Sequence, residues 1–421
     1  MSPPNRGLIG LGVGLGVAGA AAAAGIVAER MSRQRGDALE TGVSLVIEPS
    51  LELVAVADDG VPLHVEVDEP EPGAAAALAA RLAEREPGAP GIPTVVLSHG
   101  YCLSSRCWVF QRRALVAAGY RVVTWDQRGH GLSEKGGKES YTIAQLGEDL
   151  FQVLAVTAPK GPLLLGGHSM GGMTTMALGS SHPDLVRERV LGLACISTSP
   201  GGMPLASGNL AASTGRVLLG GLGPQVAGLM EGRPELLRLI IDNNAELEDF
   251  LVERYSFASP VPRSVVRLTA SMILGTDLGV ISSFTPAFED YDQRAGLVPY
   301  RGVQSLVFNG QHDLLTPPEH SELIVEALPG AQHVIVRDAG HVIMLEHPEL
   351  LNEQLLSLAE RSMLSVARDV DAADQPRVRR VVTDVGKRRR IEEAKRSPKR
   401  VKGAKAATGT KGPKPAKGKA S

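Results

Sequence analysis

The sequence predicts an α/β protein: a mostly parallel β-sheet with helices on both faces and an inserted helical cap. Apolar, strand-like runs alternate with segments of helical spacing up to residue 200, and the alternation resumes at residue 296. Such alternation needs crossover connections, which produce parallel strands covered by helices. Between these parts, residues 201–295 show helical patterns and no clear strand. They are therefore expected to form a cap, or lid, over the sheet.

The first part of the core is expected to span residues 41–200. Residues 51–69 alternate apolar and polar side chains around Asp59-Gly60, which is typical of a β-hairpin. A polar, alanine-rich link over residues 73–91 leads into the alternating region. There the strand-like runs are TVVLSHG, RVVTWDQRG, PLLLGGHS and RVLGLACIS, and the helical segments between them are SRCWVFQRRALVAAG, TIAQLGEDLFQVLAVTA and GGMTTMALGSSH.

The second part of the core is expected to span residues 296–366. Its strand-like runs are VQSLVFNG and QHVIVRDAG, and its helical segments are PEHSELIVEALP and PELLNEQLLSLAERSM. The cap that separates the two parts contains PELLRLIIDNNAELEDFLVERYS and RSVVRLTASMIL, which both have helical spacing. The two parts are therefore expected to complete one sheet.

Ser169 lies between a strand-like run and a helical segment, in the stretch GGHSMGG. Gly167-His168-Ser169-Met170-Gly171 fits the pattern G-x-S-x-G in the strand–turn–helix context that gives this pattern meaning. A nucleophile at such a turn adopts a strained backbone so that its hydroxyl stands clear of the sheet, and the flanking glycines avoid collisions. A tight turn alone would explain Gly167 and Gly171 but would not require serine. Ser169 is therefore predicted to be a nucleophile.

A serine nucleophile needs a histidine base and an acid that orients the histidine. Asp313 follows the run VQSLVFNG, and His341 follows QHVIVRDAG, so both are expected at the carboxyl edge of the sheet. The order Ser169, Asp313, His341 is the one expected for this strand–turn–helix arrangement. Asp338 and Glu346 are alternative acids, but both are close to His341 in sequence, whereas Asp313 comes from a separate strand.

Attack on an acyl carbon would create an oxyanion, which two backbone N–H groups usually stabilise. One is expected from Met170, directly after the serine, and the other from Tyr101 in the loop SHGYCLSS. His99-Gly100 would let this loop bend toward the serine. An ordinary turn at a strand end is the alternative explanation of the same residues.

The chain resembles the α/β-hydrolase fold family of the serine lipase and esterase type. The resemblance is carried by LSHGYCLSSRCW, TWDQRGHGLSE, GGHSMGG, NGQHDLLTP and DAGHVIMLEHP. It implies an eight-stranded sheet, a Ser169–Asp313–His341 triad, oxyanion donors Tyr101 and Met170, and no cofactor. GHSMGG together with RGHGLS is similar to monoacylglycerol lipases and also occurs in perhydrolase-like members. Members that open epoxides or displace halide carry aspartate in place of Ser169.

The predicted function is hydrolysis of carboxylic esters, on a small-molecule or lipid substrate, through an acyl-enzyme. The alternatives are a catalytically silent fold used for binding or scaffolding, or a non-ester, perhydrolase-like activity. No metal site is expected, because Cys102, Cys107 and Cys195 lack metal-ligand spacing. The same cysteines are expected to be reduced thiols, which favours a cytosolic catalytic domain.

Residues 1–40 are expected to be an N-terminal hydrophobic segment with a basic flank. Residues 8–28 contain no charge and no proline, and such a stretch is about long enough to span a bilayer. A transmembrane anchor, a cleaved secretory signal and a buried or disordered Ala/Gly segment remain open. Arg30, Arg33 and Arg35 follow the segment and favour an anchor with a cytoplasmic catalytic domain, with secretion as the alternative.

Residues 367–421 are expected to be a disordered basic tail. Residues 387–421 carry 14 Lys and Arg against two acids, whereas the other 386 residues carry 30 basic and 44 acidic side chains. The tail has few apolar residues to bury. Contact with an anionic membrane surface, contact with nucleic acid, and no defined partner remain open; an N-terminal anchor would favour the membrane over nucleic acid.

Overall fold

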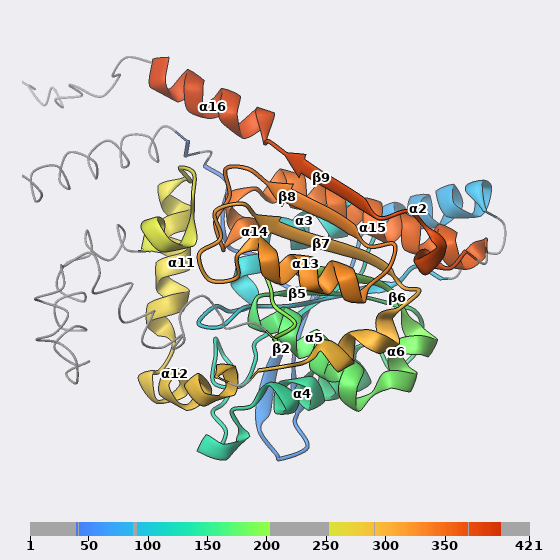
Figure 1. Cartoon of the computed structure of the whole chain (residues 1–421), viewed down its shortest axis with the longest axis horizontal. Helices are drawn as coiled ribbons and strands as arrows, with labels where there is room; N and C mark the ends of the chain where they lie inside the picture. Colours follow the sequence, from blue (N-terminus) through green and yellow to red (C-terminus); the bar gives the residue numbers. More distant parts are fainter. Residues whose placement is uncertain are drawn as a thin grey trace, which may run out of the picture.

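A computed structural model of the chain describes residues 39–40, 42–86, 91–202, 252–289, 291–368 and 370–396. Its centre is a nine-stranded sheet in the order β1-β2-β4-β3-β5-β6-β7-β8-β9 (Figure 1). Strand β2 is antiparallel to β1 and to β4, and the other neighbours are parallel. The strands are β1 Leu51–Val56, β2 Pro62–Asp68, β3 Thr94–Ser98, β4 Val122–Trp125, β5 Leu163–His168, β6 Val190–Ile196, β7 Gln304–Gly310, β8 Gln332–Val336 and β9 Val378–Val382.

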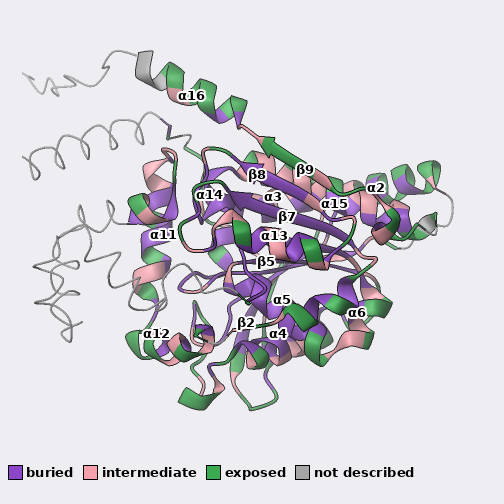
Figure 2. Ribbon diagram, viewed as in Figure 1, coloured by how far each residue is buried: buried purple, intermediate pink, exposed green. Residues whose placement is uncertain are grey.

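Helices cover both faces of this sheet, because strands β3 to β7 present buried apolar side chains on both sides. On one face α2, α3 and α15 contribute to a single core cluster, and on the other α4, α5, α6 and α13 contribute to a second one. Figure 2 shows the central strands as a buried layer under helices that are exposed on their outer side, while the edge strand β9 is exposed. The helices are α2 Pro72–Arg85, α3 Val109–Ala117, α4 Ile143–Thr157, α5 Met170–Ser181, α6 Pro183–Arg189, α13 Pro318–Ala327, α14 Ile343–Glu346 and α15 Pro348–Ala367.

The cap region is inserted between β6 and β7, and its described part is helical. It contains α11 Arg263–Gly275, α12 Leu278–Phe284 and a 3₁₀ turn at Thr285–Phe288. The two ends of the insertion meet, because Gly201 pairs with Asp292 in an isolated β-bridge and the Gln293 N–H donates to the carbonyl of Pro200. The remaining cap residues, 203–251, lie outside the described residues.

The sequence prediction needs one correction at the C-terminal end. Residues 367–421 were expected to be disordered, and the sheet was expected to have eight strands. Residues 378–382 instead form the ninth strand, β9, which pairs in parallel with β8, and α16 Val385–Arg396 follows it. Arginines of this segment have partners in the core: Arg377 and Arg379 contact Glu322, and Arg380 donates to Gln332. Residues 397–421 lie outside the described residues.

Within the described residues, no single helix has the length and apolar character needed to cross a membrane. The adjacent segments Arg263–Gly275 and Leu278–Phe288 reach that length and composition only when taken together, and they are bent by 79°. Residues 8–28, where an anchor or signal was expected, lie outside the described residues. The membrane anchor and the cytoplasmic placement of the catalytic domain therefore remain predictions from the sequence.

Candidate active site

Ser169 occupies a strained turn between β5 and α5. Its φ is 50° and its ψ is −118°, a conformation that costs a residue with a side chain about 1–3 kcal/mol. A methyl group on Gly167 would lie 2.3 Å from the Gly171 carbonyl oxygen, and one on Gly171 would lie 2.2 Å from the carbonyl oxygen of Ser98. Because both collisions are with backbone, no larger residue fits at either glycine without moving the turn.

Asp313 and His341 come from the ends of β7 and β8 and are hydrogen-bonded to each other. His341 Nδ1 lies 3.0 Å from Oδ1 and 2.9 Å from Oδ2 of Asp313. Both side chains are buried. Because a carboxylate only accepts, Nδ1 of His341 carries the proton and Nε2 is left free to act as a base. The two side chains therefore have the relation that a base and its orienting acid require.

Thr316 holds the Asp313 carboxylate in place. Its N–H donates to Oδ1 and its hydroxyl donates to Oδ2, both at 2.9 Å, and the Leu315 N–H also donates to Oδ1 at 2.9 Å. Burial by itself would raise the pKa of Asp313, but His341 and these donors outweigh burial and lower the pKa of Asp313. The carboxylate is therefore ionised at neutral pH.

His168, the residue before Ser169, ties the serine turn to the His341 loop. Its Nε2 lies 2.9 Å from the backbone carbonyl oxygen of His341, and the two rings lie 4.7 Å apart. A carbonyl only accepts, so Nε2 of His168 carries the proton. Burial and then the nearby His341 lower the pKa of His168 to about 3, which leaves the ring neutral at physiological pH. Ser169 and His341 are thus brought to the same point of the sheet edge.

The loop that carries Tyr101 lies directly against the serine turn. A methyl group on Gly100 would lie 2.5 Å from Nδ1 of His168 and 3.2 Å from Cβ of Ser169. Within the described residues, neither the Tyr101 N–H nor the Met170 N–H has a recorded hydrogen-bond acceptor. Two backbone donors next to Ser169 are therefore available to a ligand oxygen.

His99 fixes the orientation of the Gly100–Tyr101 peptide. The Gln127 N–H donates to Nε2 of His99 at 2.9 Å, so the His99 proton is on Nδ1, which donates to the Gly100 carbonyl at 2.7 Å. In a trans peptide the N–H points away from the carbonyl. Anchoring the Gly100 carbonyl therefore sets the direction of the Tyr101 N–H.

The cap packs over this edge of the sheet through Tyr101. The Tyr101 hydroxyl donates to the Ile281 carbonyl of α12 at 2.6 Å, and its ring lies 5.3 Å from that of Phe288. Met170, beside the serine, belongs to the same buried apolar cluster as Phe284 and Phe288. The surroundings of Ser169 are therefore apolar on the cap side.

The alternative acids, Asp338 and Glu346, have partners elsewhere. Asp338 pairs with Arg388 at 3.0 Å, and Glu346 accepts the Gly340 N–H at 2.6 Å. The three cysteines are free and buried, and the described part of the chain has no cluster of three or more His, Cys, Asp or Glu side chains placed to hold a metal ion.

Sequence reasoning did not identify several residues that support the site. Gln127 and Thr316 act through backbone N–H groups or through other side chains, and no spacing in the chain marks such contacts. Glu346 is considered from the sequence only as an alternative acid, whereas it accepts the Gly340 N–H. The only signal for Gln127 is its place in the block DQRGHGLS, one residue after Asp126.

Comparison with known proteins identifies the family of the chain. A model of the alpha/beta hydrolase fold matches residues 93–348. A pimeloyl-[acyl-carrier protein] methyl ester esterase of Yersinia pseudotuberculosis is 28% identical over 274 residues, which are 64% of this chain and 93% of that protein. A putative carbamate hydrolase, RutD, of Variovorax paradoxus is 35% identical over 132 residues, but the match spans only 31% of this chain and 42% of that protein.

Solved structures show the same fold. An esterase from Exiguobacterium antarcticum superposes with a TM-score of 0.55 at 19% identity, covering 74% of this chain and 100% of that chain. A bromoperoxidase from Bacillus anthracis also gives a TM-score of 0.55, at 22% identity, covering 73% of this chain and 99% of that chain. At these identities the likeness concerns the fold alone. Because the family model covers more than half of the chain, the chain belongs to the α/β-hydrolase fold family.

Proposed function

We propose that this chain is a serine hydrolase that cleaves carboxylic esters through a Ser169–His341–Asp313 triad. The observation that carries the proposal is the strained Ser169 at the β5–α5 turn, next to the His341 loop with its bound Asp313. A glycine-lined turn needs no serine, and a structural histidine needs no free nitrogen. The methyl ester esterase among the relatives supports an ester as the substrate class.

In the proposed reaction, the Ser169 hydroxyl attacks the ester carbonyl carbon while Nε2 of His341 takes its proton. Asp313 keeps the Nδ1 proton of His341 in place and stabilises the charged ring. The Tyr101 and Met170 N–H groups hold the oxyanion, and the protonated His341 gives its proton to the leaving alcohol. Water, deprotonated by the same nitrogen, then attacks the acyl-enzyme and releases the carboxylic acid.

The cap favours an ester with an apolar acyl chain, which includes monoacylglycerol-type lipids. Phe284, Phe288 and Val280 belong to the apolar cluster that reaches Met170 beside the serine. Rates with p-nitrophenyl esters of increasing chain length would test this preference. An optimum at acetate, with rates that fall steadily for longer chains, would contradict it.

The decisive experiment is the Ser169→Ala variant. We expect it to lose ester turnover and labelling by a fluorophosphonate probe while it keeps the melting temperature of the wild-type protein. Labelling at the wild-type level would rule out Ser169 as the nucleophile. A wild-type protein that is folded but neither hydrolyses esters nor reacts with the probe would favour a catalytically silent role.

A further inference from the structure

Helix α16 packs next to the His341 loop although it lies beyond the part of the chain that matches the family. The matched region ends at residue 348, whereas β9 and α16 span residues 378–396. Strand β9 extends the sheet beside β8, the strand that leads into the His341 loop, and α16 begins three residues later (Figure 1). The first turn of α16 therefore lies near the predicted base.

Lys387, in this first turn, is buried. Its Nζ donates to the Ser259 hydroxyl at 2.7 Å and to the backbone carbonyl of Glu346 at 2.8 Å. The residue is 6% exposed. Burial opposes the charge and lowers the pKa of Lys387 to about 8, because its two acceptors are neutral groups and nearby carboxylates compensate only in part. A buried ammonium group of this kind links the C-terminal helix to the cap and to the end of α14.

Glu346 lies at the junction that Lys387 reaches, and its carboxylate joins the cap to the His341 loop. Oε2 accepts the Gly340 N–H at 2.6 Å, one residue before His341. Oε1 accepts the N–H groups of Ala258 and Ser259, at 2.9 and 2.5 Å, and the Ser259 hydroxyl at 2.7 Å. Since Glu346 is 2% exposed, these four donors replace its water.

The residue after His341 is held in the same way. The Val342 N–H donates to the carbonyl of Ser256 at 3.0 Å. Both neighbours of His341 are therefore bonded to the cap segment 256–259, directly or through Glu346. A shift of this segment would move the His341 backbone and with it the position of Nε2.

The N-terminus of α16 is docked on the residue that follows Glu346. Oδ1 of Asp384 accepts the Lys387 N–H at 2.7 Å, and Oδ2 accepts Nδ1–H of His347 at 3.0 Å. Arg388, the next residue, pairs with Asp338 at 3.0 Å. The first turn of α16 is thus attached through polar contacts with residues 338–347.

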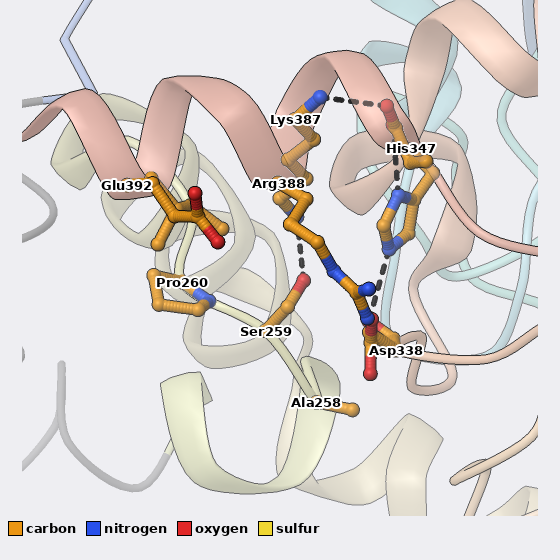
Figure 3. A pocket seen from close by; sticks show the side chains of 10 residues that line it. Ala258, Ser259, Pro260, Asp338, His347, Lys387, Arg388 and Glu392 are labelled. Carbon is orange, nitrogen blue, oxygen red and sulfur yellow. Dashed lines mark hydrogen bonds and ion pairs between the residues drawn. The ribbon is translucent and has the colours of Figure 1, made fainter.

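A cavity of about 350 Å³ separates the outer part of α16 from the cap. Figure 3 shows Lys387 and Arg388 of the helix facing His347, Asp338 and Ser259 around this space. Because a cavity replaces close apolar packing here, polar contacts attach the helix: the buried ones of its first turn, and an exposed ion pair of Arg390 with Glu349.

We infer that Lys387 and Glu346 are positioning residues, through which α16 holds the His341 loop against the cap. Lys387 fixes Ser259 and the Glu346 backbone, and the Glu346 carboxylate fixes Gly340 and Ser259. The catalytic part of this inference rests on the proposed function, since it takes His341 as the base. The contact of α16 with the His341 loop and the cap is independent of the proposed function.

The test compares Lys387→Met with Arg389→Met in the full chain. Methionine keeps an unbranched stem at position 387 and removes the donors. Arg389 lies on the same helix, is 81% exposed and pairs with Glu393, so its loss changes charge without touching the His341 loop. Backbone amide exchange, followed by mass spectrometry, reports on residues 256–260 and 339–343, while p-nitrophenyl butyrate gives kcat and KM.

We expect Lys387→Met to speed exchange in both segments and to lower kcat by about tenfold with a smaller change in KM, because the base is displaced while the acyl site is kept. Arg389→Met should match the wild type in all readouts. The inference would be overturned if Lys387→Met had the same amide exchange rates and the same kcat as Arg389→Met. Absence of ester turnover in the wild type would instead refute the proposed function, and exchange would still decide the contact.

Ser259→Ala covers the case in which Lys387→Met releases the whole helix. It removes the hydroxyl that links Lys387 to Glu346 and leaves the contact of Asp384 with His347 intact. We expect faster exchange at residues 339–343 and a lower kcat, both smaller in size than in Lys387→Met. Unchanged exchange and kcat in Ser259→Ala, with α16 released in Lys387→Met, would reduce Lys387 to a helix anchor and overturn the positioning role.

Discussion

Among the buried aspartate–histidine pairs of the described residues, His341–Asp313 and His64–Asp126 differ in what binds the second ring nitrogen. His341 contacts Asp313 through Nδ1, and within the described residues Nε2 has no recorded partner. His64 has a carboxylate on each side: Nδ1 lies 3.3 Å from Oδ2 of Asp126, and Nε2 lies 2.6 Å from Oε1 of Glu52. The pair that includes His341 keeps a nitrogen for proton transfer, whereas both nitrogens of His64 are engaged in ion pairs.

The charge states follow from this difference. The nearby Asp126 carboxylate outweighs burial and, together with Glu52, raises the pKa of His64 to about 9, so the ring is charged at neutral pH. Burial opposes ionisation of Asp126, but His64 and the N–H groups of Ser105 and Leu132 lower its pKa to about 2. Strands β1 and β2, the loop after β4 and the turn at Ser105 meet at this ion pair. The pair is therefore expected to contribute to stability and not to turnover.

The largest expected effect is on turnover, in Asp313→Asn. An amide at this position no longer stabilises the charged His341 ring and favours the wrong tautomer, so kcat/KM should fall by about 10³–10⁴-fold. The free energy of unfolding should change much less. Initial rates with p-nitrophenyl butyrate and urea denaturation would measure the two quantities. A loss of less than tenfold would mean that the two pairs do not differ in function.

The next effect is on stability, in Asp126→Asn. This change leaves the charged His64 with a single carboxylate and weakens the bonds to the Ser105 and Leu132 N–H groups. We expect the free energy of unfolding to fall by about 3 kcal/mol, measured by urea denaturation at pH 7. The kcat of the folded protein should fall far less than in Asp313→Asn. An unchanged unfolding midpoint would show that the Asp126 pair contributes little.

The third prediction concerns the pH dependence of stability. Because the pKa of His64 is raised in the folded protein, its contribution is complete below the unfolded value near 6.5 and is lost as pH rises through about 9. After allowance for solvent screening, the loss should be about 2 kcal/mol. The contribution of His64 is obtained by measuring the free energy of unfolding of the wild type and of His64→Gln from pH 6 to 10. A stability difference that is constant over this range would contradict it.

The smallest effect is expected in Glu52→Gln. Glu52 is 58% exposed, so its ion pair with His64 is screened by water. The free energy of unfolding should fall by less than about 1 kcal/mol, and the alkaline loss of stability should begin at lower pH. Esterase rates should match the wild type. A loss as large as that in Asp126→Asn would mean that Glu52, not Asp126, is the main partner of His64.

The fold and the order of the site residues could be predicted because they depend on local patterns. Apolar runs mark the parallel strands, and carboxyl ends of parallel strands share one edge, which brings Asp313 to His341. The supporting contacts could not be predicted, since Thr316 acts through its own N–H and His168 through the His341 carbonyl. These bonds depend on loop geometry that spacing does not encode.

The order of the C-terminal segment could not be predicted for a different reason. VRRVV holds three valines, which favour a strand, but it is short and is followed by basic residues, and its ordering depends on partners far away in the chain. Glu322 accepts from Arg377 and Arg379, and Ser259 accepts from Lys387. The composition of a segment gives its charge but not its partners. A basic strand that has acidic partners therefore cannot be distinguished by composition from a basic tail.

Strand β9 also has a consequence for self-association. Strand β8 has the sequence QHVIV and is buried apart from its first residue, and β9 covers the edge that β8 would otherwise present. An uncovered apolar edge strand is a template for pairing with other chains. A chain that ended at residue 366, the limit set by sequence patterns, would expose this edge and is expected to aggregate. The two arginines on the outermost strand, Arg379 and Arg380, are exposed charges that discourage such pairing in the longer chain.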